Sequence, residues 1–170
     1  KMAHQAAAIL AESRESVAKA INAPPETILF TSCATESNNS LRAIAPLLPE
    51  GKRTILYNPL EHPAMLETLF HLRDKGFSLI ALSPDRQGRI SPENLRESWR
   101  DDVGLAVCMA ANNETGTLYD IKRMAAIARE REALFFSDMV QALGKPPVGG
   151  QASRGDFASF PAPNTHGPQG

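Results

Sequence analysis

The sequence predicts an α/β domain in which a mostly parallel sheet is flanked by helices. Short apolar runs alternate with stretches of helical periodicity, as in sheets whose parallel strands are joined by crossover helices. The run from Ala133 to Asp138 is too short for a helix and is bounded by polar residues, which predicts a buried strand. Open α/β sheets bind ligands beyond the carboxyl ends of their strands, so Asp138 marks the edge where we expect the functional site.

Apolar spacing and terminal signals predict the helices. The first helix follows from residues spaced for one helical face between Met2 and Ile21, and it ends near Asn22, before a Pro-Pro pair. A later helix ends at Gly76, a residue typical of helix C-termini. The predicted helices after the first one span Glu36 to Ala45, Ala64 to Lys75, Ser91 to Trp99 and Asp120 to Glu132.

Short apolar runs between these helices predict the strands. They span Thr27 to Thr31, Thr54 to Tyr57, Ser78 to Leu82, Gly104 to Ala110, Ala133 to Asp138 and Phe157 to Phe160. No second domain is visible in this alternation. The chain opens on a helical pattern without a cap and stops soon after the last strand, so we expect residues 1–170 to be one partial domain.

Composition argues against several function classes. The chain has 18 Lys and Arg against 19 Asp and Glu, a balance that does not point to nucleic acid or an anionic membrane as a partner. Cys33 and Cys108 lie far apart and form no disulfide framework, which fits a reducing compartment. No apolar run is long enough to span a bilayer, and no signal segment is visible, so we expect a cytoplasmic protein.

Two loops that follow predicted strands offer groups for an anionic or aromatic ligand. Thr31 to Glu36 leads into a helix N-terminus, where backbone N–H groups can cradle an anion, although for this loop taken alone an ordinary Ser/Thr helix cap is the favoured explanation. His62 lies in a polar, Pro-bounded loop. It could stack on a flat ring or exchange a proton near neutral pH, and a solvent-exposed loop histidine fits the same pattern.

Two further loops add amides and carboxylates. Asn112 to Gly116 follows a predicted buried strand, and its Asn side chains suit either ligand binding or turn stabilisation. Asp138 and Gln141 are close enough in sequence to address one small ring, although Asp138 could instead cap the next segment. A buried Asp138 needs a cationic partner, which could come from the protein or from a protonated ring nitrogen of a cofactor.

Taken together, the loops resemble those of the NifS-like cysteine desulfurases. These belong to the class V aminotransferase group, whose large fold-type-I domain binds pyridoxal 5′-phosphate (PLP). Five segments are similar to family motifs and occur in the family's order across essentially the whole chain, which is more specific than any single match. They are Phe30 to Asn39 (FTSGATESNN), Glu61 to Glu67 (EHPAVLE), Asn112 to Gly116 (NNETG), Ser137 to Lys145 (TDAVQALGK) and Asp156 to Gly170 (D..SFSAHKFHGPKG).

The resemblance implies where the phosphate and ring of PLP would bind. Thr35, with the backbone of Cys33 and Ala34, would hold the phosphate, and His62 would stack on the ring. Asp138 would keep the ring nitrogen protonated, which makes PLP an electron sink.

The ring hydroxyl and the expected reaction follow from the same resemblance. Gln141 and Asn113 would hydrogen-bond the hydroxyl. The implied reaction transfers sulfur from L-cysteine to a protein cysteine and releases alanine, as used in iron–sulfur cluster assembly. The implied assembly is a homodimer that meets a sulfur-acceptor protein, with no nucleic acid, membrane or metal.

The sequence departs from the family pattern at the expected catalytic segment. Asn164 stands where the family has the lysine that attaches PLP, and Pro161 and Pro163 replace a serine and a histidine. Cys33 replaces a glycine in the phosphate loop. The family's small C-terminal domain and sulfur-carrying cysteine have no counterpart among these residues. We therefore expect a degenerate site without desulfurase activity. The alternatives are another class V reaction, such as transamination or lyase chemistry, and a non-catalytic partner-binding module.

Overall fold

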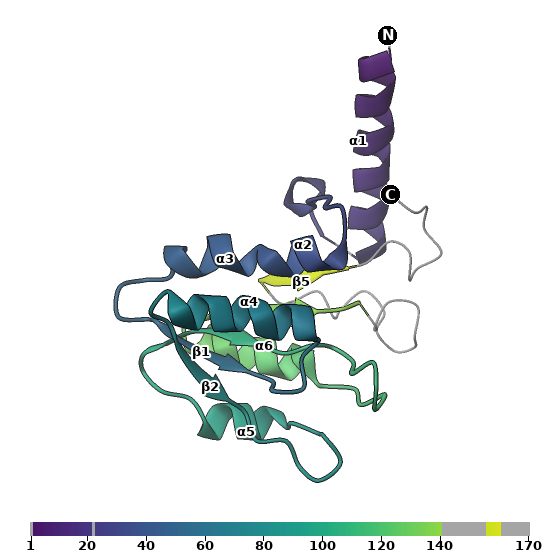
Figure 1. The fold of residues 1–170 in the computed structure, drawn as a ribbon. Coiled ribbons are helices and arrows are strands. Elements are labelled where there is room, and N and C mark those ends of the chain that lie inside the picture. Colours follow the sequence, from purple (N-terminus) through teal and green to yellow (C-terminus); the bar gives the residue numbers. More distant parts are fainter. Residues whose placement is uncertain (1, 22, 141–155, 161–170) are drawn as a thin grey trace.

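A five-stranded parallel sheet forms the centre of the chain in the computed structural model, which describes residues 2–21, 23–140 and 156–160. Neighbouring strands follow the order β2-β1-β3-β4-β5, and every pairing is parallel (Figure 1). This confirms the predicted fold class. The strands are β1 (Thr54–Tyr57), β2 (Ser78–Ala81), β3 (Val103–Val107), β4 (Leu134–Asp138) and β5 (Phe157–Ser159).

Helices cover both faces of the sheet. Side chains alternate between the faces along each strand, so Leu105 and Phe136 pack with α3 and α4, while Ala106 and Phe135 pack with α5 and α6. The helices are α1 (Met2–Ile21), α2 (Ala34–Asn39), α3 (Leu41–Ile44), α4 (Pro63–Asp74), α5 (Pro92–Glu97) and α6 (Ile121–Glu130), with 3-10 turns at Pro25–Thr27 and Ala45–Leu47.

The central strand β3 is covered on both of its faces. All five of its residues are buried, as expected for a strand with helices on either side. A Cβ atom at Gly104 would overlap the backbone oxygen of Lys52, so this position admits no larger residue without a shift of the backbone. The pairing continues beyond the strand, because the N–H groups of Cys108 and Ala110 donate to Phe136 and Asp138 of the β4 chain.

Two predicted elements differ from the structure. The strand predicted at Thr27 to Thr31 is wrong: Thr27 ends a 3-10 turn, and the residues that follow are in no strand. A strand needs a neighbouring strand to pair with, and none of the described strands pairs with this segment. Leu29 is 84% exposed there. The helix predicted at Glu36 to Ala45 is divided at Ser40 into α2 and α3.

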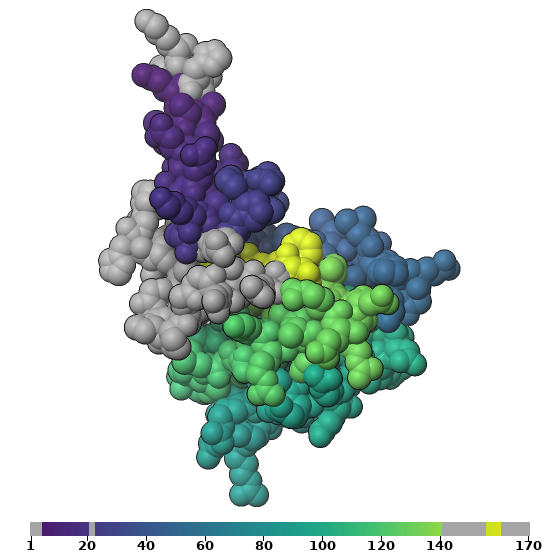
Figure 2. All heavy atoms as spheres, turned by 180° about the vertical axis from the view of Figure 1, so that it is seen from behind, coloured from purple at the N-terminus to yellow at the C-terminus, as the bar shows by residue number. Residues whose placement is uncertain are grey.

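The first helix projects away from the sheet, as the two opposite views show (Figures 1 and 2). Its predicted apolar face is not covered by the described residues, since Ile9 is 63% and Val17 37% exposed, whereas Ala18 is buried. Of the helices described, none combines the length and the apolar character needed to cross a bilayer.

Candidate active site

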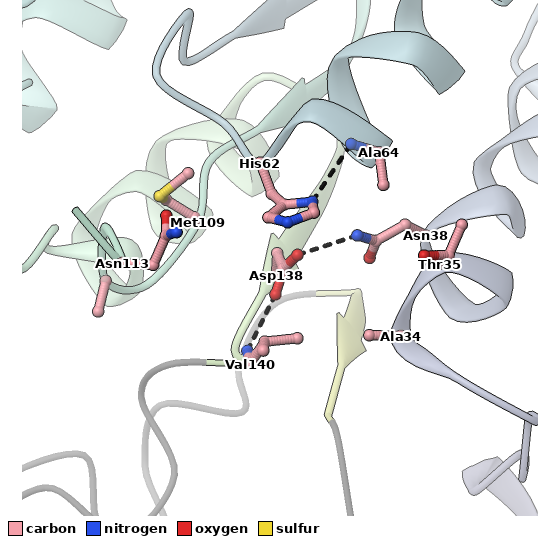
Figure 3. A pocket seen from close by; sticks show the side chains of 10 residues that line it. Ala34, Thr35, Asn38, His62, Ala64, Met109, Asn113, Asp138 and Val140 are labelled. Carbon is pink, nitrogen blue, oxygen red and sulfur yellow. Dashed lines mark hydrogen bonds between the residues drawn. The ribbon is translucent and has the colours of Figure 1, made fainter. Parts of the chain in front are cut away.

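One pocket lies at the carboxyl ends of the strands, where the loops after β1, β3 and β4 meet the start of α2 (Figure 3). Parallel strands place these loops at the same edge of the sheet. The residues that line the pocket are Ala34, Thr35, Asn38, His62, Ala64, Met109, Ala111, Asn113, Asp138 and Val140.

Asp138 is the buried carboxylate of this pocket. It is the last residue of β4 and is 6% exposed. Oδ2 accepts a hydrogen bond from Nδ2 of Asn38 at 2.9 Å, and Oδ1 accepts one from the backbone N–H of Val140 at 2.9 Å (Figure 3). Both donors are neutral, and none of the ion pairs in the described part of the chain reaches Asp138. The carboxylate is therefore able to pair with a cation from a ligand.

His62 lies beside Asp138 in the same pocket, at the start of α4 (Figure 3). It is the N-cap residue, and its Nδ1 accepts a hydrogen bond from the N–H of Ala64 at 3.2 Å (Figure 3). Pro63 occupies the first helical position, where its missing N–H costs nothing. Because Nδ1 is an acceptor here, Nε2 is the ring nitrogen left to carry or transfer a proton.

The loop before α2 is organised by Glu36. Its carboxylate accepts the backbone N–H and the hydroxyl of Ser32, both at 2.6 Å, and these bonds lower the pKa of Glu36. Cys33 is the exposed N-cap residue, and the backbone N–H of Glu36 is the largest cause that lowers the pKa of its thiol. The φ of Cys33 is −163°, an extended conformation open to any residue, so the backbone there does not require the family's glycine. Cys33 itself is not among the pocket-lining residues.

The loop after β3 contains two adjacent asparagines, Asn112 and Asn113, with different surroundings. Asn112 is buried: its Oδ1 accepts the N–H groups of Glu114 and Thr115, each at 2.9 Å, and its Nδ2 donates to the backbone oxygen of Leu60 at 3.0 Å. Asn113 is exposed and lines the pocket. Asn112 therefore holds the shape of the loop, and Asn113 is the residue presented to a ligand.

Glu61 is a second buried carboxyl group, directly before His62. It is 4% exposed, and its Oε1 accepts the backbone N–H of Met109 at 2.5 Å. Burial, and to a lesser degree the charge of Asp138, raises the pKa of Glu61 to about 8, although the hydrogen bond from Met109 opposes the shift. The resemblance placed Glu61 in a motif but gave it no role.

The structure brings most of the predicted site residues together. Ala34, Thr35, His62, Asn113 and Asp138 share the pocket. Gln141, Asn164, Pro161 and Pro163 lie outside the described residues. Within the described part, no group of three His, Cys, Asp or Glu side chains could hold a metal ion.

Sequence reasoning gave no role to Asn38, Glu61 or Met109, whose contacts shape the site. The first two stand inside the matched motifs, which was the available signal for them. Met109 follows β3 closely, and no motif in the sequence marked it as a site residue.

The fold and the pocket define a class of protein, an α/β domain with a pocket where its parallel strands end, the place where such folds keep their ligand sites. The model of the aminotransferase class-V family matches residues 1–170, and the chain belongs to this family. The predicted resemblance to cysteine desulfurases is likewise confirmed.

Similar proteins support this membership. Cysteine desulfurase IscS of Dictyoglomus turgidum is 38% identical over 160 residues, which are 94% of this chain and 41% of that protein. Cysteine desulfurase NifS of Azotobacter vinelandii is 35% identical over 168 residues, 98% of this chain and 42% of that protein. The chain thus spans less than half the length of these relatives.

Solved structures agree in fold. A NifS-like protein superposes with a TM-score of 0.91 at 38% identity, over 100% of this chain and 47% of that one. DndA from Streptomyces lividans superposes with a TM-score of 0.88 at 33% identity, over 99% of this chain and 48% of that one.

Proposed function

We propose that the chain belongs to a cysteine-desulfurase-like protein and forms part of a PLP site. The observation that carries this proposal is Asp138, a buried carboxylate that has neutral donors and no cation among the described residues. A protonated ring nitrogen would neutralise it. His62 and Thr35 line the same pocket and suit the ring and the phosphate of that cofactor.

The residues present would divide the work as follows. Asp138 would hold the proton on the ring nitrogen, and Asn38 would keep the carboxylate oriented through its 2.9 Å hydrogen bond. His62 would cover the ring and move a proton through Nε2, because Nδ1 is engaged with Ala64. Asn113 would reach the ring hydroxyl from the loop that Asn112 holds. When bound, PLP would supply an electron sink for the cleavage of bonds in an amino-acid substrate.

We further propose that this chain lacks desulfurase turnover. Asn164 occupies the position of the attaching lysine, and an amide nitrogen is no substitute for an amine nucleophile. Pro161 and Pro163 supply neither a hydroxyl nor an imidazole. The remaining contacts include charge-assisted hydrogen bonds worth about 1.5–3 kcal/mol each, which supports weak, reversible PLP binding.

The same substitutions support a second candidate function, a non-catalytic module that binds a partner. Exposed apolar side chains in two segments of the chain are available for self-association or for a partner protein. Leu29 is 84%, Phe30 47% and Leu47 82% exposed. A sulfur-acceptor protein and a second copy of the chain are the partners we propose.

The test is to mix the protein that carries this chain with PLP, reduce it with borohydride and map the modified peptides by mass. We expect saturable PLP binding without specific attachment to one lysine, and no alanine release from L-cysteine. PLP fixed at a single lysine together with alanine release would overturn the inactive assignment. An absence of any PLP binding would overturn the cofactor assignment.

A further inference from the structure

Glu61 is a buried carboxyl group for which the fold provides no counter-charge. It is 4% exposed and joins β1 to α4 immediately before His62. Its two oxygens differ: Oε1 accepts the N–H of Met109 at 2.5 Å, whereas Oε2 has no hydrogen-bond partner among the described residues. An ionised carboxylate in this place would have one donor for a full buried charge, which is strongly unfavourable.

The ionisable groups that face Glu61 from the surrounding elements do not offer a cation. Asp138, at the end of β4, has the same sign of charge. Burial raises the pKa of the Cys108 thiol well above its usual value and also raises the pKa of the Tyr119 phenol, so both remain neutral near pH 7. The ion pairs among the described residues lie elsewhere.

We propose that Glu61 is a positioning residue that acts as a neutral carboxylic acid, joining the start of α4 to the segment after β3 and leaving Asp138 as the single negative charge among the described residues of the pocket. The Met109 contact supports the first part, because Met109 lines the pocket and Glu61 adjoins the N-cap His62. One carboxylate matches one cationic ring. A second would leave an unbalanced charge in the same buried region.

Only the role toward a ring cation rests on the proposed function. The protonation of Glu61 is a property of the fold and is testable without any cofactor. The folded-state pKa lies above the ordinary value of 4.5, so the stabilising contribution of Glu61 is fully present below that value. It is lost progressively as the pH rises from there through about 8.

The experiment combines an NMR titration of carboxyl-¹³C-labelled glutamate with thermal unfolding at pH 5 to 9. Glu61→Gln is the central variant, because its amide keeps the acceptor for the Met109 N–H and cannot ionise. We expect one glutamate signal to titrate well above pH 6 in the unmodified protein and to be missing in the variant. We expect the melting temperature of the unmodified protein to fall relative to Glu61→Gln by on the order of 5 °C between pH 6 and pH 9.

Glu67→Gln is the matched control, since Glu67 is exposed on α4. It should follow the pH profile of the unmodified protein. Parallel profiles for Glu61→Gln and the unmodified protein, or a Glu61 signal that titrates near 4.5, would overturn the proposal. Unfolding of Glu61→Gln at pH 6 would do the same.

A second measurement separates this inference from the cofactor assignment. PLP affinity should be similar for Glu61→Gln and the unmodified protein at pH 6.5, where both have a neutral side chain at this position. A loss of affinity of tenfold or more in a folded Glu61→Gln would contradict the neutral-acid role. If neither protein binds PLP, the proposed function fails while the titration result stands.

Discussion

Asn38 donates a 2.9 Å hydrogen bond from Nδ2 to the Oδ2 of Asp138, although the two residues lie 100 positions apart in the sequence. The bond fixes α2 against the end of β4. Both residues are buried, and Oδ1 of Asn38 has no partner among the described residues. Asn38 therefore orients the carboxylate through its donor, while its own side-chain oxygen stays buried and unpartnered among the described residues.

Replacing Asn38 by alanine should destabilise the protein by about 1–3 kcal/mol, because the buried carboxylate loses one of its two donors. Chemical denaturation will measure the loss. Ser40→Ala, at the exposed junction of α2 and α3, is the control and should change the free energy of unfolding far less. Equal effects of the two changes would show that the Asn38 contact contributes little.

Replacing Asp138 by asparagine should weaken PLP binding by at least about tenfold, because the ring nitrogen loses its charged partner. Fluorescence titration with PLP will measure the dissociation constant. Asp101→Asn changes an exposed carboxylate away from the pocket and should leave the constant unchanged. Unaltered affinity in a folded Asp138→Asn would contradict the proposed ion pair.

The adjacent asparagines should respond differently to alanine. Asn112→Ala removes an acceptor shared by two backbone N–H groups and should cost about 2–3 kcal/mol of stability. Asn113→Ala should leave the melting temperature nearly unchanged and reduce PLP affinity, since Asn113 is exposed in the pocket. The reverse pattern in thermal unfolding and PLP titration would refute this division.

The hydrogen bond between Thr54 and Asp102 should make the stability of the fold depend on pH in the acid range. Oδ2 of Asp102 accepts the hydroxyl of Thr54 at 2.6 Å, and this bond is the main cause that lowers the pKa of Asp102. A lowered carboxyl pKa stabilises the fold above the ordinary value of 3.8, and that contribution is lost as the pH falls through the folded-state pKa. Thr54→Val should therefore lower the melting temperature at pH 7 and have less effect at pH 3, whereas Thr54→Ser should keep the pH dependence. Similar penalties for Thr54→Val at both pH values would contradict the assignment.

Restoring Asn164→Lys should give at most partial attachment of PLP. Pro161 and Pro163 would still lack the expected donors and restrict the backbone. Borohydride reduction and peptide mass mapping will measure the attached fraction. Full desulfurase activity from this one change would show that the prolines matter little.

The sequence was sufficient for the five strands of the sheet and for the residues at their ends. Apolar runs such as Leu134 to Ser137 identify buried strands, and the polar residue that follows each run is carried to the ligand-binding edge by parallel topology. His62, Asn113 and Asp138 share one pocket for this reason.

What the sequence could not supply are contacts that depend on tertiary packing. The bond between Asn38 and Asp138 and the burial of Glu61 join segments that are distant in sequence, and no periodicity encodes such distances. The failed strand at Thr27 to Thr31 has a related cause. Its composition suits a strand, but an apolar run becomes one only when a neighbour supplies the ladder, which a local pattern cannot reveal.

Asn112 and Asn113, the adjacent asparagines of the loop after β3, tolerate substitution differently. A change at Asn112 decides whether the loop keeps its shape, because backbone N–H groups depend on its side chain. A change at Asn113 alters only a side chain that lines the pocket. Substitution at position 113 can therefore exchange the polar group that the loop shows to the pocket, while the hydrogen bonds that hold the loop stay in place.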